Sequence, residues 1–371
     1  MAYEIGTLSL ERLFGPVTQA TAALTRLDER VAHSTVRDGF IERQNFADAV
    51  AALWIEGELV HLEDLVLHDS HMDIRTPTHE LTRAHAVLRV RRQILGNKPG
   101  WALSRVGLRQ LTGRGTVAPT VEESREGEAA SSEEDAGEVA AATEQDALAQ
   151  EFAAIDVVLA RSTKVLAGIE AGPRTPTADE RPSLVYDLDW DEDERLGEWQ
   201  DVLQATKDLP AALRVALLID AWTEIEVLQH AQWLGPLLAA SLLRQAGATA
   251  NHLACLHVGA QKVPRERRRG RDRTGRLLAF LDAIVEAAAA GLKEHDRLVL
   301  ARGQLERRLR SRRASSKLPQ LVELTLARPL VSTGMIRAEL KLTKQGALNL
   351  VADLGLREIT GRKRFQAWGV V

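Results

Sequence analysis

The sequence predicts a mainly α-helical protein, in which a helical bundle body precedes a C-terminal winged helix-turn-helix. Two observations predict this fold class. Alanine and leucine are plentiful and aromatic residues make up only 4% of the chain, a composition that favours helices over strands. Two short β-rich runs stand near the C-terminus, where three helix-like segments precede them, and this order is typical of a winged helix.

Length and composition restrict the class of protein. The 371 residues are enough for two or three domains, and 45% hydrophobic with 27% charged residues is usual for a soluble globular protein. No apolar run is long enough to cross a bilayer, and no signal peptide is recognisable at the first residues. The single cysteine, Cys255, has no partner for an internal disulfide. We therefore expect a cytoplasmic protein without a membrane partner.

Shifts in composition divide the chain into four segments. We expect an N-terminal helical domain over residues 1–111, a disordered acidic linker over 112–147, a helical core domain over 148–314 and the winged helix-turn-helix over 315–371. The linker is predicted because "GTVAPTVEESREGEAASSEEDAGEVAAATEQ" has almost no large apolar residue. Such a segment buries too little surface to offset the entropy lost on ordering.

The N-terminal segment reads as helices from its apolar spacing. The run "FADAVAALWIEGELVHLEDLVLHD" has apolar residues three and four apart. Thr78 follows Pro77 and is the predicted N-cap of the next helix, which "GNKPG" ends. After the linker, a helix is expected to resume near Ala147 and to run to about Ile169.

The core segment predicts further helices. From Arg195 to about Ala246 the pattern is helical and strongly apolar, as expected for helices buried at the centre of a bundle. The run "VPRERRRGRDRTGR" is predicted to be a basic loop or a helix start. Two separate helices are predicted after it, "LLAFLDAIVEAAAAGL" and "HDRLVLARGQLERRLRSRRAS".

The C-terminal segment has a cap or a breaker at each predicted boundary. The first helix begins after Ser315 or Ser316, and Ser332 caps the second helix. Thr343 caps the third helix, which Gly355 ends. The runs "LREIT" and "RFQAWGVV" read as strands, and "GRK" closes the hairpin between them.

This arrangement predicts contact with double-stranded DNA. The third helix of such a module enters the major groove, where Gln and Asn can pair with adenine and Lys can donate to guanine. From Lys262 onward, Lys and Arg exceed Asp and Glu by about fourteen, which suits a phosphate partner. Solvated helix faces or a protein-docking role would also explain this charge. The predicted DNA-binding residues are Thr343, Lys344, Gln345, Asn349, Arg362, Lys363 and Arg364.

A second cluster of polar residues raises the question of an enzyme. Residues 61–80 are rich in His, Asp and Glu, and His61, His68, His71 and His79 are candidate metal ligands. No zinc signature accompanies them, and helix surfaces and caps explain most of the cluster. The chain has no phosphate-binding loop, dinucleotide fingerprint or hydrolase elbow, so we expect no catalytic residue and no cofactor. Cys255 lies in the apolar run LACLHV and reads as an inert buried thiol.

Two stretches carry a resemblance to a known family. The runs "WIEGELVHLEDLVLHDSHMDIRTPTHELTRAH" and "LVSTGMIRAELKLTKQGALNLVADLGLREITGRKRFQAWG" resemble a bacterial, often plasmid-encoded family. Its members carry a domain of unknown function followed by a dedicated helix-turn-helix domain. The resemblance implies DNA binding and a regulatory role, and it implies no established reaction.

The order of elements is also distantly similar to Fic-domain adenylyltransferases that carry a C-terminal winged helix. "LWIEGE" resembles their inhibitory helix, with Glu56 at the position of its glutamate, although Ala52 stands where that motif has Ser or Thr. The histidine, proline, phenylalanine and glycine pattern of the Fic active-site loop is missing, and aligning "GRDRTGRLL" puts Arg265 at the position of the catalytic histidine. The resemblance therefore implies that nucleotide transfer has been lost.

Taken together, these features predict a DNA-binding transcriptional or plasmid-associated regulator. Its helical body would be non-catalytic and would serve sensing, partner docking or dimerisation, which makes a homodimer possible. Two alternatives stay open at this point. One is an enzyme whose site uses the polar cluster of residues 61–80, and the other is a protein-interaction scaffold whose winged helix docks protein.

Overall fold

The structure is a computed structural model that describes residues 3–73, 76–113, 190–309, 317–360 and 366–370. It is mainly α-helical, as predicted. Contacts divide the chain into two compact units, Met1–Gly100 with Glu192–Val371, and Trp101–Asp191. Apart from Thr112 and Gly113, the predicted linker lies outside the described residues, and so does the helix predicted between 147 and 169. The boundaries between the four predicted segments stay predictions.

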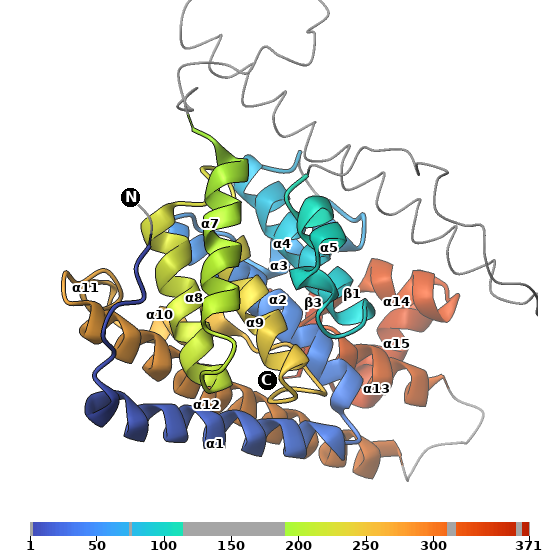
Figure 1. Cartoon of the computed structure of the whole chain (residues 1–371). Helices are drawn as coiled ribbons and strands as arrows, with labels where there is room; N and C mark the ends of the chain where they lie inside the picture. Colours follow the sequence, from blue (N-terminus) through green and yellow to red (C-terminus); the bar gives the residue numbers. More distant parts are fainter. Residues whose placement is uncertain (1–2, 74–75, 114–189, 310–316, 361–365, 371) are drawn as a thin grey trace, which may run out of the picture. The chain divides into compact units, whose positions relative to one another are not determined.

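The larger unit contains the helices that we call the helical body. Figure 1 shows their order along the chain. They are α1 (Leu10–Ala32), α2 (Arg37–Glu56), α3 (Leu62–Asp69), α4 (His79–Gly96), α7 (Glu192–Ala205), α8 (Ala211–Ile225), α9 (Leu234–Gln245), α10 (Leu256–Lys262), α11 (Arg265–Arg268) and α12 (Arg273–Leu309). In the smaller unit, a short 3₁₀ turn η1 (Trp101–Leu103) leads into α5 (Arg105–Leu111), whose N-cap Ser104 accepts a hydrogen bond from the backbone of Gly107.

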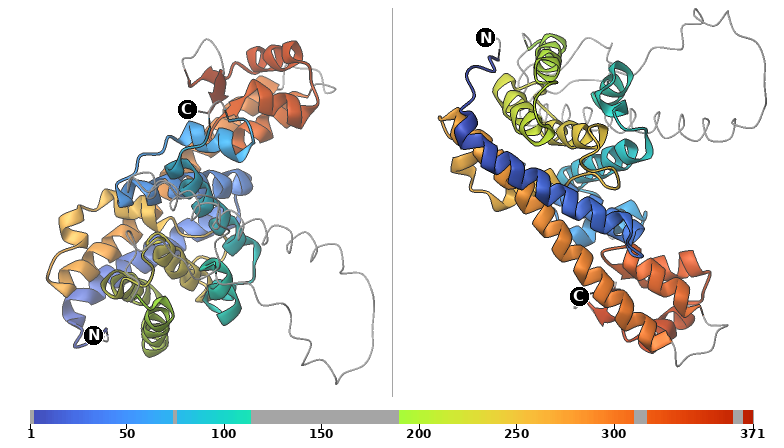
Figure 2. Two further views of the ribbon diagram at one scale, coloured as in Figure 1. Left: turned by 90° about the horizontal axis from the view of Figure 1, so that it is seen from above. Right: turned by 60° about the horizontal axis from the view of Figure 1, so that its bottom comes forward.

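The longest helix corrects a prediction. The sequence predicted two helices between residues 277 and 315, but α12 runs without a break from Arg273 to Leu309. Gly291 does not end a helix here. A methyl group at its α-carbon would lie 2.6 Å from Leu27 of α1, so this glycine lets α1 and α12 approach closely. Figures 1 and 2 show α1 lying along α12.

A buried ion pair joins three helices of the body. Asp48 of α2 and Arg91 of α4 are both fully buried, and the Arg91 guanidinium donates to the Asp48 carboxylate. Asp48 also accepts from the Nδ1 of His257 at 3.0 Å and from the backbone N–H groups of His257 and Val258 at the start of α10. One buried carboxylate therefore holds α2, α4 and α10 together.

The surroundings of Asp48 and Arg91 also determine the chemical character of Cys255. Arg91 donates to the backbone carbonyl of Leu253 at 3.1 Å and approaches the Cys255 sulfur at 3.4 Å. Cys255 is buried, and burial raises its pKa to about 12. Because the thiolate is the nucleophilic form, the prediction of a buried thiol is confirmed and its chemistry is that of a core residue.

The last part of the larger unit is the C-terminal module, which we define as residues 317–370. Its helices are α13 (Leu318–Ala327), α14 (Thr333–Leu340) and α15 (Lys344–Leu354). A three-stranded antiparallel sheet, in the order β1-β3-β2, joins β1 (Val331–Ser332), β3 (Ala367–Gly369) and β2 (Arg357–Glu358). This is the predicted order of three helices and a hairpin, with β1 as an addition that the sequence did not predict.

The helix caps of this module can be compared with their predictions. The hydroxyl of Ser332 accepts from the backbone of Met335, and that of Thr343 accepts from Gly346, so both predicted N-caps are confirmed. Gly355 ends α15 in the left-handed conformation, also as predicted. The cap predicted at Ser315 or Ser316 is wrong. Lys317 takes the N-cap position, and α13 begins at Leu318. Pro319 lies in the first turn of the helix, where its missing N–H costs no intrahelical hydrogen bond.

Among the helices in the described parts of the chain, none combines the length and apolar character that a membrane span requires.

The buried ion pair gives a test of the body. Replacing Arg91 by Met leaves the Asp48 charge buried with only His257 as a side-chain partner, so we expect a loss of about 3–5 kcal/mol in the free energy of unfolding. The matched control is Arg30→Met, which removes an exposed pair with Asp296 and should cost less than about 1 kcal/mol. Urea unfolding of the full chain measures both. Equal losses in the two variants would contradict the role given to Arg91.

Candidate nucleic-acid interface

The predicted recognition helix has one buried and one exposed side. Ala347, Val351 and Leu354 face the interior of the module, and Leu350 is partly buried. The four predicted DNA-binding residues on and before α15 lie together on the opposite side, where all are exposed: Thr343, Lys344, Gln345 and Asn349. The separation follows from helical periodicity, since the buried stripe recurs at three- and four-residue intervals.

Two of these side chains contact each other. The amide of Gln345 donates to the carbonyl oxygen of Asn349 at 2.9 Å, across one helical turn. The bond aligns the two amides on the exposed side of α15, and it leaves the Asn349 NH₂ group and the Gln345 carbonyl oxygen for a partner. Donor and acceptor side by side are what the edge of an adenine requires in the major groove.

The hairpin that follows α15 is held at its base. The N–H of Ile359 donates to the carbonyl of Ala367 at 2.9 Å, and the N–H of Ala367 donates to the hydroxyl of Thr360 at 3.1 Å. Gln366 and Glu358 are hydrogen-bonded at 3.1 Å on the same pair of strands. The predicted phosphate contacts at Arg362, Lys363 and Arg364 fall between these strands and lie outside the described residues.

Cations cap the C-terminal ends of all three helices of the module. Arg43 of α2 donates to the carbonyls of Thr325 and Leu326, at 2.7 and 2.8 Å. Arg308 of α12 donates to the carbonyl of Leu354 at 2.6 Å. Lys317, within the module, donates to the carbonyl of Leu340 at the end of α14. A positive charge is favourable at this end of a helix, where the last carbonyls have no partner within it. Arg43 and Arg308 therefore bind the first and third helices of the module to the body.

Close backbone contact accompanies these bonds. A methyl group on Gly39 of α2 would lie 2.7 Å from the carbonyl oxygen of Leu326, which ends the buried part of α13. Only glycine leaves room for this approach. Arg43 follows one turn later on α2 and is 5% exposed, so the contact between α2 and α13 is both tight and polar.

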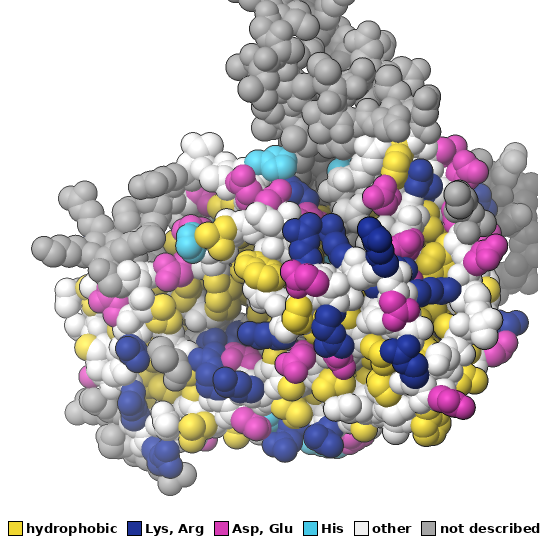
Figure 3. Space-filling view, turned by 90° about the vertical axis from the view of Figure 1, so that its left-hand side faces the viewer, with side chains coloured by type: hydrophobic (Ala, Val, Ile, Leu, Met, Phe, Trp, Pro, Cys, Tyr) yellow, Lys and Arg dark blue, Asp and Glu magenta, His cyan; other side chains and the backbone are white. Residues whose placement is uncertain are grey.

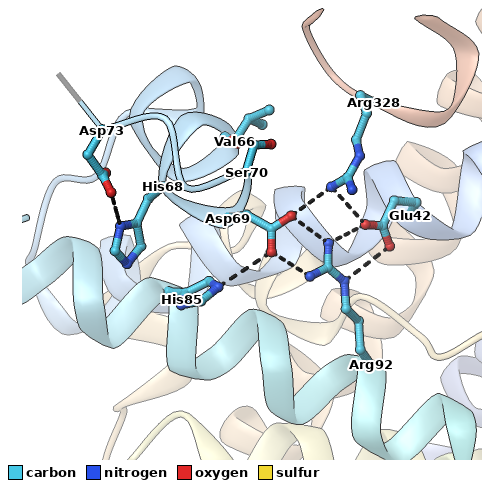
Figure 4. A network of polar contacts seen from close by, with 9 residues as sticks. All are labelled: Glu42, Val66, His68, Asp69, Ser70, Asp73, His85, Arg92 and Arg328. Carbon is cyan, nitrogen blue, oxygen red and sulfur yellow. Dashed lines mark hydrogen bonds and ion pairs between the residues drawn. The ribbon is translucent and has the colours of Figure 1, made fainter. Parts of the chain in front are cut away.

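A network of charges continues the contact between body and module, and Figure 4 shows its members. Arg328, just after α13, reaches Asp69 at 2.7 Å and Glu42 at 3.3 Å. Arg92 of α4 donates to the same two carboxylates. Its Nη2 lies 2.9 Å from the Oδ2 of Asp69 and also donates to Glu42. His85 lies 3.4 Å from Asp69 on the other side. We call this set of five residues the junction network.

The network changes the acidity of its central carboxyl group. Burial alone would raise the pKa of Asp69, but hydrogen bonds from His85, Arg92 and Arg328 outweigh that effect and hold the pKa far below its usual range. Asp69 is therefore negatively charged over the whole neutral and mildly acidic range. Asp69 belongs to the polar cluster of residues 61–80, whereas no sequence pattern indicated a role for Glu42, Arg92 or Arg328. Nothing local in a sequence pairs two residues that are 259 positions apart, as Asp69 and Arg328 are.

The four histidines proposed as metal ligands do not converge. His61 precedes α3, and His79 begins α4. His68 contacts Asp73 at 3.0 Å, while His71 takes a left-handed turn conformation at φ 53°. Within the described ranges, no group of three His, Cys, Asp or Glu side chains is arranged to hold a metal ion.

The junction network gives a prediction on pH. Because the folded-state pKa of Asp69 is depressed, its contribution to stability is present above the unfolded-state pKa of about 4 and is lost as the pH falls below it. Between pH 7 and pH 3, Asp69→Asn should lose roughly 1 kcal/mol less of its free energy of unfolding than the wild type does. The control Asp38→Asn changes an exposed carboxyl on α2 and should follow the wild type. Parallel curves for Asp69→Asn and wild type would contradict the prediction.

Comparisons with known proteins agree with this division into body and module. Residues 184–310 match a family model described as a protein of unknown function, DUF1612, and residues 318–371 match one described as an HTH DNA binding domain. Over 385 aligned positions the chain is 50% identical to the uncharacterized protein y4cF of Sinorhizobium fredii (strain NBRC 101917 / NGR234), and the alignment covers 100% of both. The likeness to Fic proteins stays a prediction. The chain belongs to the family of y4cF, in which the DUF1612 region precedes a C-terminal helix-turn-helix DNA-binding domain.

Proposed function

We propose that this protein is a transcriptional or plasmid-associated regulator that binds double-stranded DNA through its C-terminal module. One observation carries the proposal. The region matched as a DNA-binding domain contains a helix, α15, whose exposed side holds a lysine and two amides clear of its buried stripe. Side chains of these types discriminate base pairs in the major groove.

The proposed mode of binding assigns separate tasks to helix and hairpin. Placed in the major groove, α15 would bring Lys344, Gln345 and Asn349 to the base edges, with Thr343 near the backbone. The hairpin would carry Arg362, Lys363 and Arg364 to the phosphates. Base contacts give specificity, whereas phosphate contacts give affinity that depends on salt.

The helical body is proposed to be non-catalytic and to serve sensing, dimerisation or partner docking. Arg43, Arg308 and the junction network support a body that fixes the orientation of α15. A regulator needs such a fixed orientation, because base contacts require α15 to enter the groove at a defined angle. Two bodies in a homodimer would set the spacing of two modules on a symmetric site.

The proposal predicts two different mutant phenotypes. Changing Arg362, Lys363 and Arg364 to Gln should weaken binding to every duplex and reduce the salt slope by up to about three charges. Changing Gln345 and Asn349 to Ala should lower the preference for a selected site, by roughly 1–3 kcal/mol for each good bidentate contact, and should leave non-specific binding nearly unchanged. Titrations of selected and scrambled duplexes at several salt concentrations measure both effects.

A charge-matched control separates local contact from net charge. Arg12, Arg26 and Arg37 are exposed on α1 and α2 of the body. Changing these three to Gln removes the same charge as the hairpin variant, and we expect the salt slope to stay at its wild-type value. If wild type has no salt-dependent affinity for DNA, the proposed function is wrong. If both triple variants behave alike, the hairpin has no specific contact with phosphate.

A further inference from the structure

The helical body contains a cavity of about 310 Å³ that the C-terminal module does not line. Its walls come from the end of α2, from α4, α8, α9, α10, α11 and α12, and from the segment between α8 and α9. The volume lies at the lower end of the range usual for small-molecule sites, which is about 300–1,000 Å³. Figure 3 shows the face that carries α11, where Lys and Arg side chains gather beside a hollow with apolar walls.

Much of the cavity wall is aromatic or aliphatic. Trp222, Trp233, Leu256 and Phe280 line it, and all four are buried. Aromatic side chains present flat apolar surfaces and prefer ring-shaped partners in stacked or edge-on contact. The wall therefore suits a compact ligand with an aromatic or similarly flat apolar body.

Besides the Oε2 of Glu58, two buried polar atoms of the wall have no hydrogen-bond partner in the described structure. They are the Nε2 of His257 and the Nε1 of Trp222, on side chains that are 2% and 1% exposed. The other ring nitrogen of His257, Nδ1, lies 3.0 Å from the Asp48 carboxylate, which can only accept, so Nδ1 carries a proton, and in the neutral ring Nε2 is the acceptor. Trp222 offers an N–H donor. Leaving either group unpaired costs stability, and a bound ligand with one donor and one acceptor would satisfy both.

The charges around the cavity favour an anion. Arg83 pairs with both Glu56 and Glu58, which leaves no free cation there, and Glu56 also accepts from the backbone N–H of Trp233 at 3.0 Å. Arg268 and Arg269 line the same cavity and form no ion pair with any described residue. Burial and the nearby guanidinium groups of Arg269 and Arg265 lower the pKa of Arg268. An anionic group placed between Arg268 and Arg269 would relieve this repulsion.

We propose that the cavity binds a small organic anion. Its flat apolar body would lie against Trp222, Trp233 and Phe280, and its carboxylate or phosphate would pair with Arg268 and Arg269. A hydrogen-bond donor on the ligand would reach His257. The proposal concerns the helical body alone, so it can succeed or fail independently of DNA binding.

Three probes that share one ring system test the proposal on the full chain. They are 1-naphthoate, 1-naphthyl phosphate and the uncharged 1-naphthalenemethanol, and binding is followed through the fluorescence of the cavity tryptophans. We expect at least one anionic probe to bind about tenfold more tightly than the alcohol, since it alone pairs with guanidinium groups. The two anionic probes distinguish a carboxylate ligand from a phosphate ligand.

Matched variants locate the binding. Arg269→Ala removes an exposed cation of the cavity, while Arg271→Ala removes an exposed cation two residues away that does not line it. The first should abolish the preference for the anion and the second should preserve it. Ala260→Phe places a ring in the cavity from α10 and should weaken the binding of all three probes. Thermal unfolding confirms that each variant is folded. Equal binding of alcohol and anions, binding unaffected by Arg269→Ala and Ala260→Phe, or no binding of any probe at millimolar concentration would overturn the proposal.

Discussion

The buried pair of Asp48 and Arg91 is the interaction on which both candidate sites of this protein depend. It fixes α2, α4 and the start of α10 against one another in a part of the body that water does not reach. Helices α2 and α4 then supply Glu42 and Arg92 to the junction network, and α10 supplies His257 to the cavity. An unpaired charge at either member would be far more costly than the loss of a surface pair, so the position of these helices is strongly determined.

Two long helices connect the cavity with the C-terminal module. The end of α2 lines the cavity near Glu56, and its beginning holds α13 through Gly39 and Arg43. Helix α12 lines the cavity at Phe280 and caps α15 through Arg308. A helix transmits a displacement along its axis because its backbone hydrogen bonds resist bending. A change in the cavity walls would therefore reach the contacts that orient α15, which is the connection that the proposed sensing role of the body requires.

Local signals in the sequence predicted the module well and the long-range contacts poorly. Ser332, Thr343 and Gly355 mark the ends of their helices through hydrogen bonds to residues a few positions away. These helix ends could therefore be predicted from the sequence alone. The two residues of β1 are too few to show an alternating pattern, and β1 exists only because it pairs with β3. The sequence predicted a break in α12 after the run that contains Gly291, and the packing role of this glycine depends on Leu27 of a distant helix. Asp69 and Arg328 meet across 259 positions, and periodicity carries no information on such a pair. The cavity arises in the same way, from residues of seven separate helices.

The central claim is that α15, held by the body, is the surface that meets DNA. Amide hydrogen exchange of the full chain, with and without a duplex selected for tight binding, tests it most directly. The account predicts slower exchange at the first turns of α15 and in the hairpin when the duplex is bound, with little change along α1 and α7. Protection on the body without any change in α15, or a selected duplex that leaves the whole chain unprotected, would contradict it.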